Sequence, residues 1–411
     1  MPARVPALRH RDFRLFTAGQ LVSLTGTWMQ SAAQLWLVYR LTGSSWLLGL
    51  VGFATQIPVF FLGPLGGLVS DTHDRRRVLL WTQASSMLLA FLLAGLTLAD
   101  RVRISHLLAI ALVLGAINAV DIPSRQAFIP DMVGKDDLMS AVALNSSVFH
   151  GARIVGPALG GLAIAAVGEG WCFFLNGVSF LPVLAALLAI RSGTAGRKPP
   201  SGRALANLLE GFRFVSQPSR VRSLLLLLGL VSLTGTPYSV LLPIFARGVL
   251  RIEAGGLGLL MGAAGLGALT GSLLLGARSQ PEGLVRWVAR SAALTGASLL
   301  VFSQSRSFWL SLVALVPIGF GITTQLAATN TLLQRGVPDA LRGRVMSAYA
   351  MMFMGTMPFG ALLAGAASGP LGAPTTVAVG GMICLLGAAT FEVREGRATR
   401  PDPAEAPRPT R

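Results

Sequence analysis

Long apolar segments alternate with short polar breaks along the whole chain. Each segment is about as long as the 20 residues that a helix needs to cross a bilayer. Because a helix buried on all sides is apolar on all sides, the polar breaks mark the ends better than any periodicity does. Twelve spans are predicted, at residues 15–40, 46–69, 78–98, 104–128, 142–167, 170–190, 222–249, 255–278, 284–303, 307–332, 345–367 and 373–392.

The composition agrees with a membrane protein. Of the 411 residues, 53% are hydrophobic and 12% are charged, and the mean hydropathy is +0.64. Soluble domains carry about 25% charged residues, so this chain has too few polar side chains to cover soluble domains of its length. The two cysteines, Cys172 and Cys384, lie far apart in apolar surroundings and are expected to be packing residues.

The charges are distributed unevenly about the predicted spans. The chain has 34 basic and 17 acidic residues, a formal net charge of +17, which on a soluble protein would indicate nucleic-acid binding. With the N-terminus inside, 27 basic residues fall on the cytoplasmic side, six fall outside, and Arg153 lies within a span. This pattern follows the positive-inside rule. Both termini are therefore expected in the cytoplasm, with the chain in the inner (plasma) membrane, in contact with membrane lipid and without a nucleic-acid partner.

The longest polar stretch divides the chain into two halves. The predicted parts are an N-terminal six-helix half, a cytoplasmic linker with a short amphipathic helix at 205–214, a C-terminal six-helix half and a Pro-rich tail expected to be disordered. Their bounds are 1–190, 191–221, 222–392 and 393–411.

The two halves also echo each other in sequence. "RQAFIPDMVGKDDLMSA" follows span four and "LQRGVPDALRGRVMSA" follows span ten, so that Pro130 and Pro338 are 208 residues apart. Two parallel six-span repeats are typical of secondary transporters, which bind substrate near the midplane between the repeats.

The break between spans two and three, "GPLGGLVSDTHDRRRVLL" at residues 63–80, is unusually charged. Its glycines, Gly63, Gly66 and Gly67, are expected to let the end of span two approach a neighbouring helix closely. Asp71 is then placed to accept hydrogen bonds from another helix's N-terminus, and the arginines that follow are placed to bind acidic residues or helix C-termini. The alternative is that the arginines serve only as a topology signal.

A glycine, an aspartate four residues later and an arginine pair beyond it resemble a loop of the major facilitator superfamily. The resemblance extends over essentially all twelve spans and implies an all-α membrane protein of twelve transmembrane helices in two pseudo-symmetric six-helix halves, usually a monomer. In that family this gate motif locks the cytoplasmic side in one access state. Here its residues are Gly63, Gly67, Asp71, Arg75 and Arg76. Thr72 stands where the family commonly has a basic residue, and Asp74 stands where it commonly has a glycine. The contacts that lock the cytoplasmic side are therefore expected to be weaker or to involve other partners.

Span five contains a second motif, "GARIVGPALGG". It resembles the superfamily's antiporter motif at Gly156, Pro157, Gly160 and Gly161, in which small residues permit close packing and proline bends the helix. The resemblance implies export in exchange for protons, while simple small-residue packing is the alternative. Longer stretches, including "GTWMQSAAQLWLVYRLTGSSWLLGLVGF", resemble the siderophore-exporter and macrolide-efflux branch.

Two charged residues inside the spans require an explanation, because a charge at the bilayer centre costs about 2.5–3.5 kcal/mol. Arg153 lies near the expected midplane of span five, on one stripe with Ser146 and His150. It is expected to bind an anionic group, to pair with an acidic proton carrier, or to form a structural ion pair. Asp121 in span four is the best candidate for proton coupling, with Arg125 and Arg153 as a charge relay. A purely structural pair with Arg125 is the alternative.

Uncharged polar residues recur within the spans. Span one carries a stripe of them at spacings of three and four, which is expected to face a watered cavity, with hydrogen bonding between helices as the alternative. The candidates for the substrate cavity are Gln20, Thr27, Trp28, Gln30, Gln34, Asn145, Tyr238, Gln325 and Asn330.

Several other classes of protein lack support. The sequence has no Walker motif, no cluster with metal-ligand spacing and no GxSxG elbow, so neither ATP, a metal, another cofactor nor catalysis is expected. The sequence predicts a secondary active transporter that exports a small amphipathic compound, drug-, macrolide- or siderophore-like, by proton antiport and alternating access. Two alternatives stay open: a lysophospholipid or lipid flippase of the same fold, and a non-transporting membrane receptor.

Overall fold

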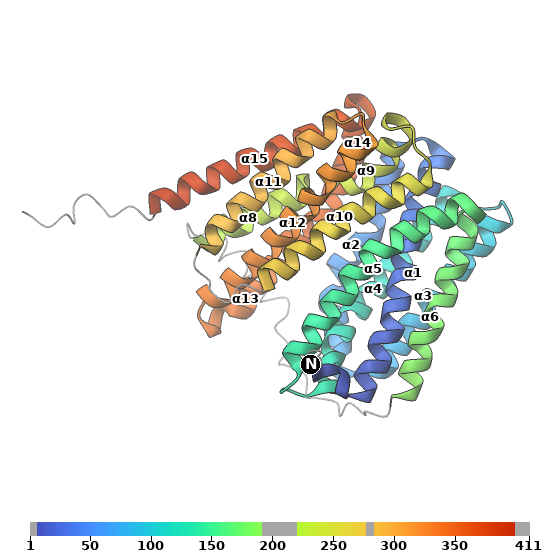
Figure 1. The fold of residues 1–411 in the computed structure, drawn as a ribbon. Helices are drawn as coiled ribbons and strands as arrows, with labels where there is room; N and C mark the ends of the chain where they lie inside the picture. The colour runs from blue at the N-terminus through green and yellow to red at the C-terminus, as the bar shows by residue number, and fades with distance from the viewer. Residues whose placement is uncertain (1–5, 191–219, 277–282, 399–411) are drawn as a thin grey trace, which may run out of the picture.

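The structure is a computed structural model that describes residues 6–190, 220–276 and 283–398. Over these ranges the chain is built from helices, without a strand (Figure 1). The amphipathic helix predicted at 205–214 lies outside the described residues, as does the tail from residue 399.

Six long helices form the N-terminal half. Their ends follow the local sequence: Gly43 ends the first helix in the left-handed conformation (φ 60°), and the side chains of Ser44 and Asp74 accept hydrogen bonds from the first backbone N–H groups of the next two. The 3₁₀ turn η1 (Pro6–Arg9) precedes them. The helices are α1 (Arg11–Thr42), α2 (Ser45–Thr72), α3 (Arg75–Leu98), α4 (Ile104–Val133), α5 (Leu138–Val167) and α6 (Glu169–Ala189).

The C-terminal half repeats this plan with two interrupted helices. One is broken near Gly235 and Pro237, where proline lacks the N–H that a helix interior needs. Both interrupted helices contain a π-helical turn, η2 or η3, a feature frequent at functional sites. The elements are α8 (Arg220–Thr234), α9 (Tyr238–Ile244), η2 (Phe245–Val249), α10 (Ala254–Gly276), α11 (Leu284–Gln304), α12 (Phe308–Gly336), α13 (Asp339–Ala350), η3 (Met351–Gly355), α14 (Thr356–Leu371) and α15 (Ala373–Ala398).

The predicted all-α membrane fold is confirmed. Among the described residues, eleven helical rods are long and apolar enough to cross a membrane. The 32-residue α1, which carries more polar side chains, adds a twelfth. The rods coincide with the predicted spans but run further at several ends; α4 reaches Val133, whereas its span was predicted to end at 128. In α4 neither Pro130 nor Asp131 ends the helix, which stops only at Gly134.

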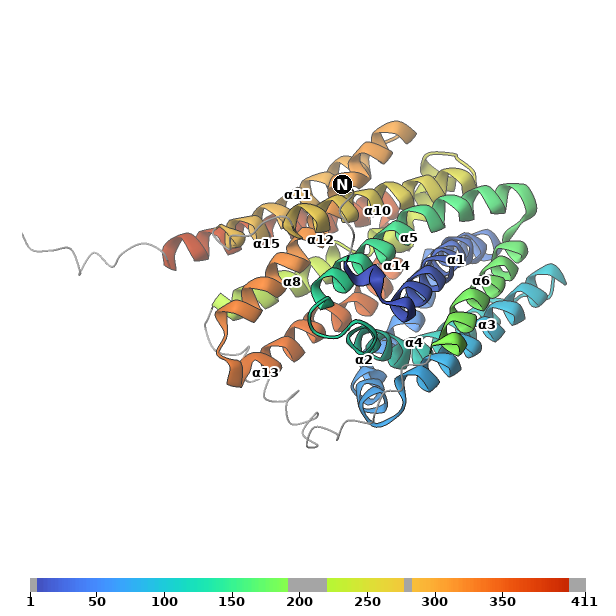
Figure 2. The ribbon, with the colours of Figure 1, turned by 60° about the horizontal axis from the view of Figure 1, so that its bottom comes forward.

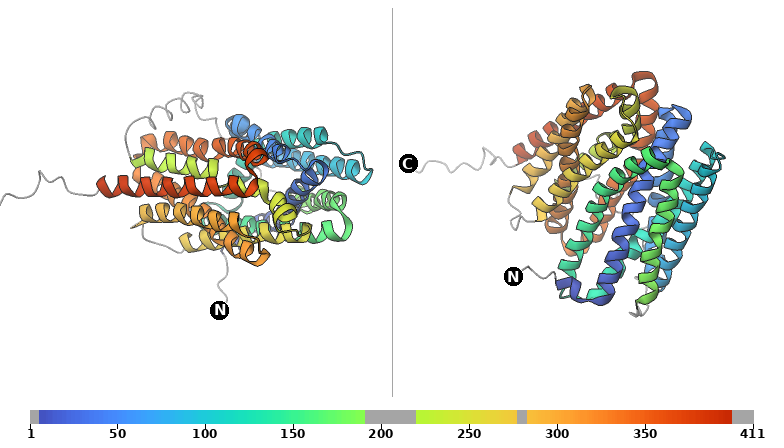
Figure 3. Two further views of the ribbon diagram at one scale, coloured as in Figure 1. Left: turned by 90° about the horizontal axis from the view of Figure 1, so that it is seen from above. Right: turned by 45° about the vertical axis from the view of Figure 1, so that its right-hand side comes forward.

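The two halves meet at one end of the bundle and diverge at the other (Figures 1 and 3). We call the end with the turns at Gly43, Gly168 and Gly372 the distal end, and the end with the start of α1, His73 and α13 the terminal end. Near the distal end the halves touch through small residues: α5 packs on α10 and α2 packs on α14. Figure 2 also presents α5 and α10 side by side. Small residues permit this close approach of helix backbones.

Candidate functional site

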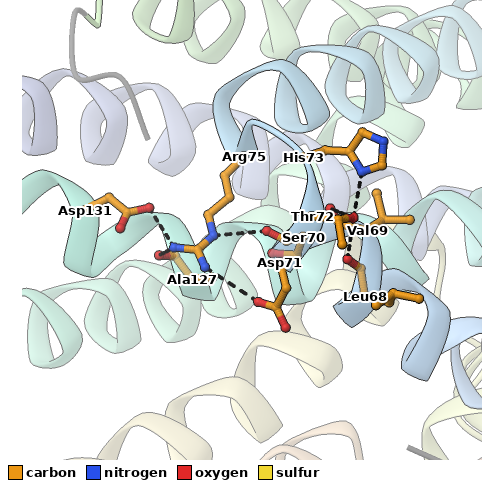
Figure 4. A network of polar contacts seen from close by, with 9 residues as sticks. All are labelled: Leu68, Val69, Ser70, Asp71, Thr72, His73, Arg75, Ala127 and Asp131. Carbon is orange, nitrogen blue, oxygen red and sulfur yellow. Dashed lines mark hydrogen bonds and ion pairs between the residues drawn. The ribbon is translucent and has the colours of Figure 1, made fainter. Parts of the chain in front are cut away.

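Arg75, the first residue of α3, is the centre of a polar cluster at the terminal end (Figure 4). Its Nη1 donates hydrogen bonds to Oδ2 of Asp131, at 2.8 Å, and to the carbonyl oxygen of Ala127, at 3.1 Å. Its Nε donates to the carbonyl oxygen of Ser70 at 3.2 Å, and its Nη2 lies 3.6 Å from Oδ1 of Asp71. Arg75 therefore ties the end of α2 to the end of α4.

The aspartates and arginines of this loop have different partners. Asp71 is 41% exposed at its side chain and pairs with Arg75; no hydrogen bond joins it to a helix N-terminus in the part of the chain that the structure describes. The expected contact is therefore absent from this arrangement, in which the halves diverge at this end. Arg76 donates to the carbonyl oxygens of Leu187 and Leu188 at the C-terminal end of α6. Asp74, where the family commonly has glycine, caps α3.

The glycines of the loop divide into one that packs and two that do not. A Cβ atom on Gly66 would collide with the backbone carbonyl of Ala119 on α4. A Cβ atom on Gly63 or Gly67 would meet nothing within 4 Å. The expectation of close approach is thus correct for Gly66 and wrong for Gly63 and Gly67, because α2 presents only one face to α4.

Asp121 is buried, with 3% of its surface exposed, in the middle of α4. Its Oδ1 accepts hydrogen bonds from Oγ1 of Thr82, at 2.8 Å, and from Nε2 of Gln83, at 2.7 Å. Its Oδ2 accepts one from Nη2 of Arg125, one turn further along the same helix, at 2.7 Å. Three donors thus compensate the burial of this carboxylate.

The network around Asp121 extends to α1. Nη1 of Arg125 donates to Oε1 of Gln20 at 3.3 Å, and Oγ of Ser23 lies 3.5 Å from Oε1 of Gln83. Nε2 of Gln20 is buried without a hydrogen-bond partner. The network therefore joins α1, α3 and α4 inside the N-terminal half. Thr82 and Gln83 were missed from the sequence, although two adjacent polar residues within an apolar span are the signal that would have identified them.

Arg153 lies apart from this network. Its Cζ is 5.4 Å from the centroid of the Trp28 ring, in a cation–π arrangement. No carboxylate of the described residues lies within ion-pair distance of it. Asp121 and Arg125 therefore come together as expected, whereas the expected pairing of Arg153 with an acidic group does not form.

The polar stripe of α1 is largely buried inside the N-terminal half. Gln20, Gln30 and Gln34 are 2%, 6% and 9% exposed. Oε1 of Gln30 accepts a hydrogen bond from Nδ2 of Asn176 on α6, at 2.8 Å. The expectation of a watered face is wrong for these three glutamines, because α1 lies between α6 and α5 and turns this stripe toward its neighbours.

The remaining cavity candidates fall into two groups. Tyr238 and Gln325 are buried in the C-terminal half, where Tyr238 packs near Phe302 and Gln325 donates to the carbonyl oxygen of Leu227. The structure thus corrects their assignment as lining residues. The four that are not buried are Thr27, Trp28, Asn145 and Asn330.

The residues of the span-five motif lie where three helices meet. A Cβ atom on Gly156 or Gly160 would press against α1, at Trp28 and Met29 respectively. One on Gly161 would come within 2.6 Å of the Ala254 carbonyl oxygen on α10. The motif therefore holds α5 against α1 within its own half and against α10 across the two halves.

Comparisons with known proteins agree with this architecture. A family model described as "Transmembrane secretion effector", of the major facilitator superfamily, matches residues 3–406. The chain is 26% identical over 386 residues to the staphyloferrin A transporter of Staphylococcus aureus, covering 90% of this chain and 94% of that protein. It is 27% identical over 414 residues to the enterobactin exporter EntS of Citrobacter koseri, covering 97% and 96%.

Two solved structures share the fold. A POT family transporter in complex with 5-aminolevulinic acid aligns with a TM-score of 0.77 at 12% identity, over 95% of this chain and 97% of that one. A bacterial homologue of the human lysosomal transporter Spinster, in an inward-facing and unoccupied conformation, aligns with a TM-score of 0.72 at 13% identity, over 98% and 100%. Since the family model spans nearly the whole sequence, the chain belongs to the transmembrane secretion effector family of major facilitator superfamily transporters.

Proposed function

We propose that this protein is a monomeric proton antiporter that exports a small amphipathic compound across the inner membrane by alternating access. The observation that carries the proposal is Asp121, a buried carboxylate in the middle of a membrane-spanning helix whose hydrogen-bond donors come from two helices. Ionisable groups at such positions are typical of proton pathways in transporters.

The orientation follows from the arginines and lysines. The terminal end carries most of the basic residues, so by the positive-inside rule it faces the cytoplasm. The halves diverge at this end and touch at the distal end, which supports an inward-open state (Figure 1). Substrate then enters from the cytoplasm and leaves after the two halves rock about the site between them.

Proton exchange at Asp121 is the coupling step. When Asp121 is ionised, Arg125 neutralises it, and Thr82 and Gln83 donate to it. Protonation removes the negative charge, so the guanidinium of Arg125 loses its counter-ion and keeps only its contact with Gln20 on α1. A change at Asp121 is thereby transmitted to α1, which packs on α5 and, through it, faces the C-terminal half. The Arg75 cluster holds the terminal end of α2, α3 and α4 together during this change.

The test is proton-coupled transport by the purified protein in inside-out liposomes with a pH-sensitive dye in the lumen. The names of the relatives suggest staphyloferrin A and enterobactin as first compounds, followed by macrolides, dyes and lysolipids. A compound that is a substrate should trigger proton leakage in the wild type. The variant Asp121→Asn should lose this leakage, and its binding of the same compound shows that the variant is folded.

A matched control is Asp100→Asn, which removes an acidic residue from the exposed α3–α4 turn outside the spans. It should behave as the wild type. Export by Asp121→Asn at the wild-type rate and with the wild-type dependence on the pH gradient would exclude Asp121 as the coupling group. Redistribution of lysolipids without proton movement would favour a flippase instead.

A further inference from the structure

Arg153 is a cation without a counter-ion inside a membrane-spanning helix. No hydrogen bond or ion pair joins its guanidinium to any residue that the structure describes, and the guanidinium lies over the Trp28 ring. Buried or half-buried charges are normally paired, because an unpaired one in a low-dielectric environment is costly. Arg125, on α4 of the same half, follows this rule by pairing with Asp121. Arg153 departs from it, which indicates a partner outside the residues that the structure describes.

A second unsatisfied group lies next to Arg153. Nδ1 of His150, three residues earlier on α5, is buried and has no hydrogen-bond partner. Residues three apart lie on the same side of a helix. An imidazole N–H at this position and the guanidinium above it would both donate to one anionic group. The guanidinium, and the imidazole in the tautomer that carries its proton on Nδ1, thus both indicate the same missing acceptor.

Aromatic side chains border this pair. Trp28 lies under the guanidinium, and its ring contacts that of Phe149 in a T-shaped arrangement with centroids 5.8 Å apart. Phe149 also meets the His150 ring at 5.6 Å and is 39% exposed. Exposed aromatic surface beside a cation suits a ligand whose negative group is attached to a flat apolar body.

The packing of α5 determines where Arg153 and His150 lie relative to the two halves. One face of α5 touches α10 at Pro157 and Gly161. The same face carries Arg153, His150 and Ser146, which lie about one, two and three helical turns before Pro157, toward the terminal end. The backbone of Arg153 also lies against α10, where its carbonyl oxygen would be 3.0 Å from a Cβ atom on Gly265. Toward the terminal end the ribbons of α5 and α10 diverge (Figure 1), so the Arg153 part of α5 lies where the two halves begin to separate.

We propose that Arg153, His150 and the rings of Trp28 and Phe149 form a recognition site for an organic anion that carries an aromatic ring. The guanidinium and the imidazole donate hydrogen bonds to the carboxylate or phenolate oxygens, and the two rings contact the aromatic body. This inference rests on the proposed function, since it assigns the chemical class of the exported compound.

Two matched probes test the charge preference: 1-naphthoate, and its neutral analogue 1-naphthamide. Binding of each to the full-length protein in nanodiscs is followed by naphthalene fluorescence, without a pH gradient. Because hydrogen bonds from charged donors are the strong ones, the wild type should bind naphthoate about tenfold more tightly than naphthamide. Arg153→Gln should reduce this ratio to about twofold or less. Trp28→Leu should weaken both probes in parallel and leave the ratio unchanged.

The control is Arg306→Gln, which removes the same charge from the exposed α11–α12 turn at the distal end and should retain the wild-type ratio. Equal binding of the two probes to the wild type, or an unchanged ratio in Arg153→Gln, would overturn the proposal. If Arg153→Gln does not fold, His150→Phe decides: it removes the second hydrogen-bonding group and leaves Arg153 in place, and a ratio equal to that of the wild type would count against the site. Because no proton gradient is present, failure of proton coupling and failure of this site are distinguishable.

Discussion

Asp131 accepts a 2.8 Å hydrogen bond from Arg75, whereas Asp71 lies 3.6 Å from the same guanidinium. Arg75 therefore belongs to the end of α4 more than to the end of α2. The Arg75–Asp131 pair is half-buried and internal to the N-terminal half, while Asp71 remains largely available to a partner from outside it. These two aspartates, four and 56 residues from one arginine, thus have separable roles.

The first prediction separates those roles. Asp131→Asn should lower the free energy of unfolding by about 1–2 kcal/mol, because it weakens a charge-assisted hydrogen bond between α3 and α4. Asp71→Asn should change it by less than about 0.5 kcal/mol, since exposed ion pairs contribute little. Asp71→Asn should nevertheless slow export, because closure of the terminal end brings the C-terminal half within reach of the Asp71 carboxylate, and the asparagine would bind it more weakly. Thermal unfolding in detergent and transport in liposomes measure the two effects. Equal loss of stability in both variants would contradict this division.

The second prediction concerns the pair of Asp121 and Arg125. Removing one partner of a buried ion pair leaves an uncompensated charge, so Arg125→Gln should destabilise the protein by about 3–5 kcal/mol. In the double variant Asp121→Asn/Arg125→Gln both charges disappear, and most of that loss should be recovered. The four-variant cycle is measured by thermal unfolding in one detergent. Additive effects of the two substitutions would mean that the residues do not act as a pair.

The spans could be predicted from the sequence because bilayer thickness imposes a length that composition alone reveals. The helix ends could not, since α4 continues past Pro130 and Asp131, which resemble a break, to Val133. The Asp121–Arg125 pair was also predictable, because residues four apart share one side of a helix. Its other donors come from α3, and contacts between helices depend on helix rotation, which an almost uniformly apolar sequence does not encode.

Helix rotation also explains why the polar residues of α1 were misassigned. The spacing of Gln20, Gln30 and Gln34 places them on one side but does not indicate what that side faces. Inside the bundle Gln20 accepts a hydrogen bond from Arg125 on α4, and Gln30 accepts one from Asn176 on α6. Trp28 and Arg153, which lie close together, belong to different helices. Their proximity arises from close packing at Gly156, where a Cβ atom would lie 2.6 Å from Cβ of Trp28.

The third prediction compares two adjacent glycines of α2. Gly66→Ala places a methyl group against the backbone of Ala119, which cannot move without displacing α4, so we expect a loss of about 1–3 kcal/mol. Gly67→Ala meets nothing within 4 Å and should stabilise the helix by about 0.5–1 kcal/mol through its higher helix propensity. Thermal unfolding of the two variants under identical conditions tests the expected difference in sign. Destabilisation of similar size by both would show that α2 is rotated relative to the structure.

The fourth prediction addresses the contact between the halves. Gly161→Ala introduces a Cβ atom 2.6 Å from the carbonyl oxygen of Ala254, so α5 and α10 must separate at the distal end. This penalty applies only while the distal end is closed, and the ratio of open to closed distal ends should therefore rise about tenfold, which corresponds to 1.4 kcal/mol. Spin labels at Arg101→Cys and Arg306→Cys, on exposed distal turns of opposite halves, should report a longer mean distance.

The control for this prediction lies on the same helix. Gly151→Ala adds the same methyl group to α5, but this methyl group meets nothing within 4 Å. The distribution of distances between the two spin labels should therefore be the same with and without Gly151→Ala. If the distance distribution shifts for Gly161→Ala but not for Gly151→Ala, the span-five motif influences the equilibrium between the access states. Indistinguishable distributions in all three proteins would mean that the motif serves packing within one state. Added aromatic acid provides a further check, because a ligand that bridges Arg153 should alter the same distribution only if its affinity differs between the two states.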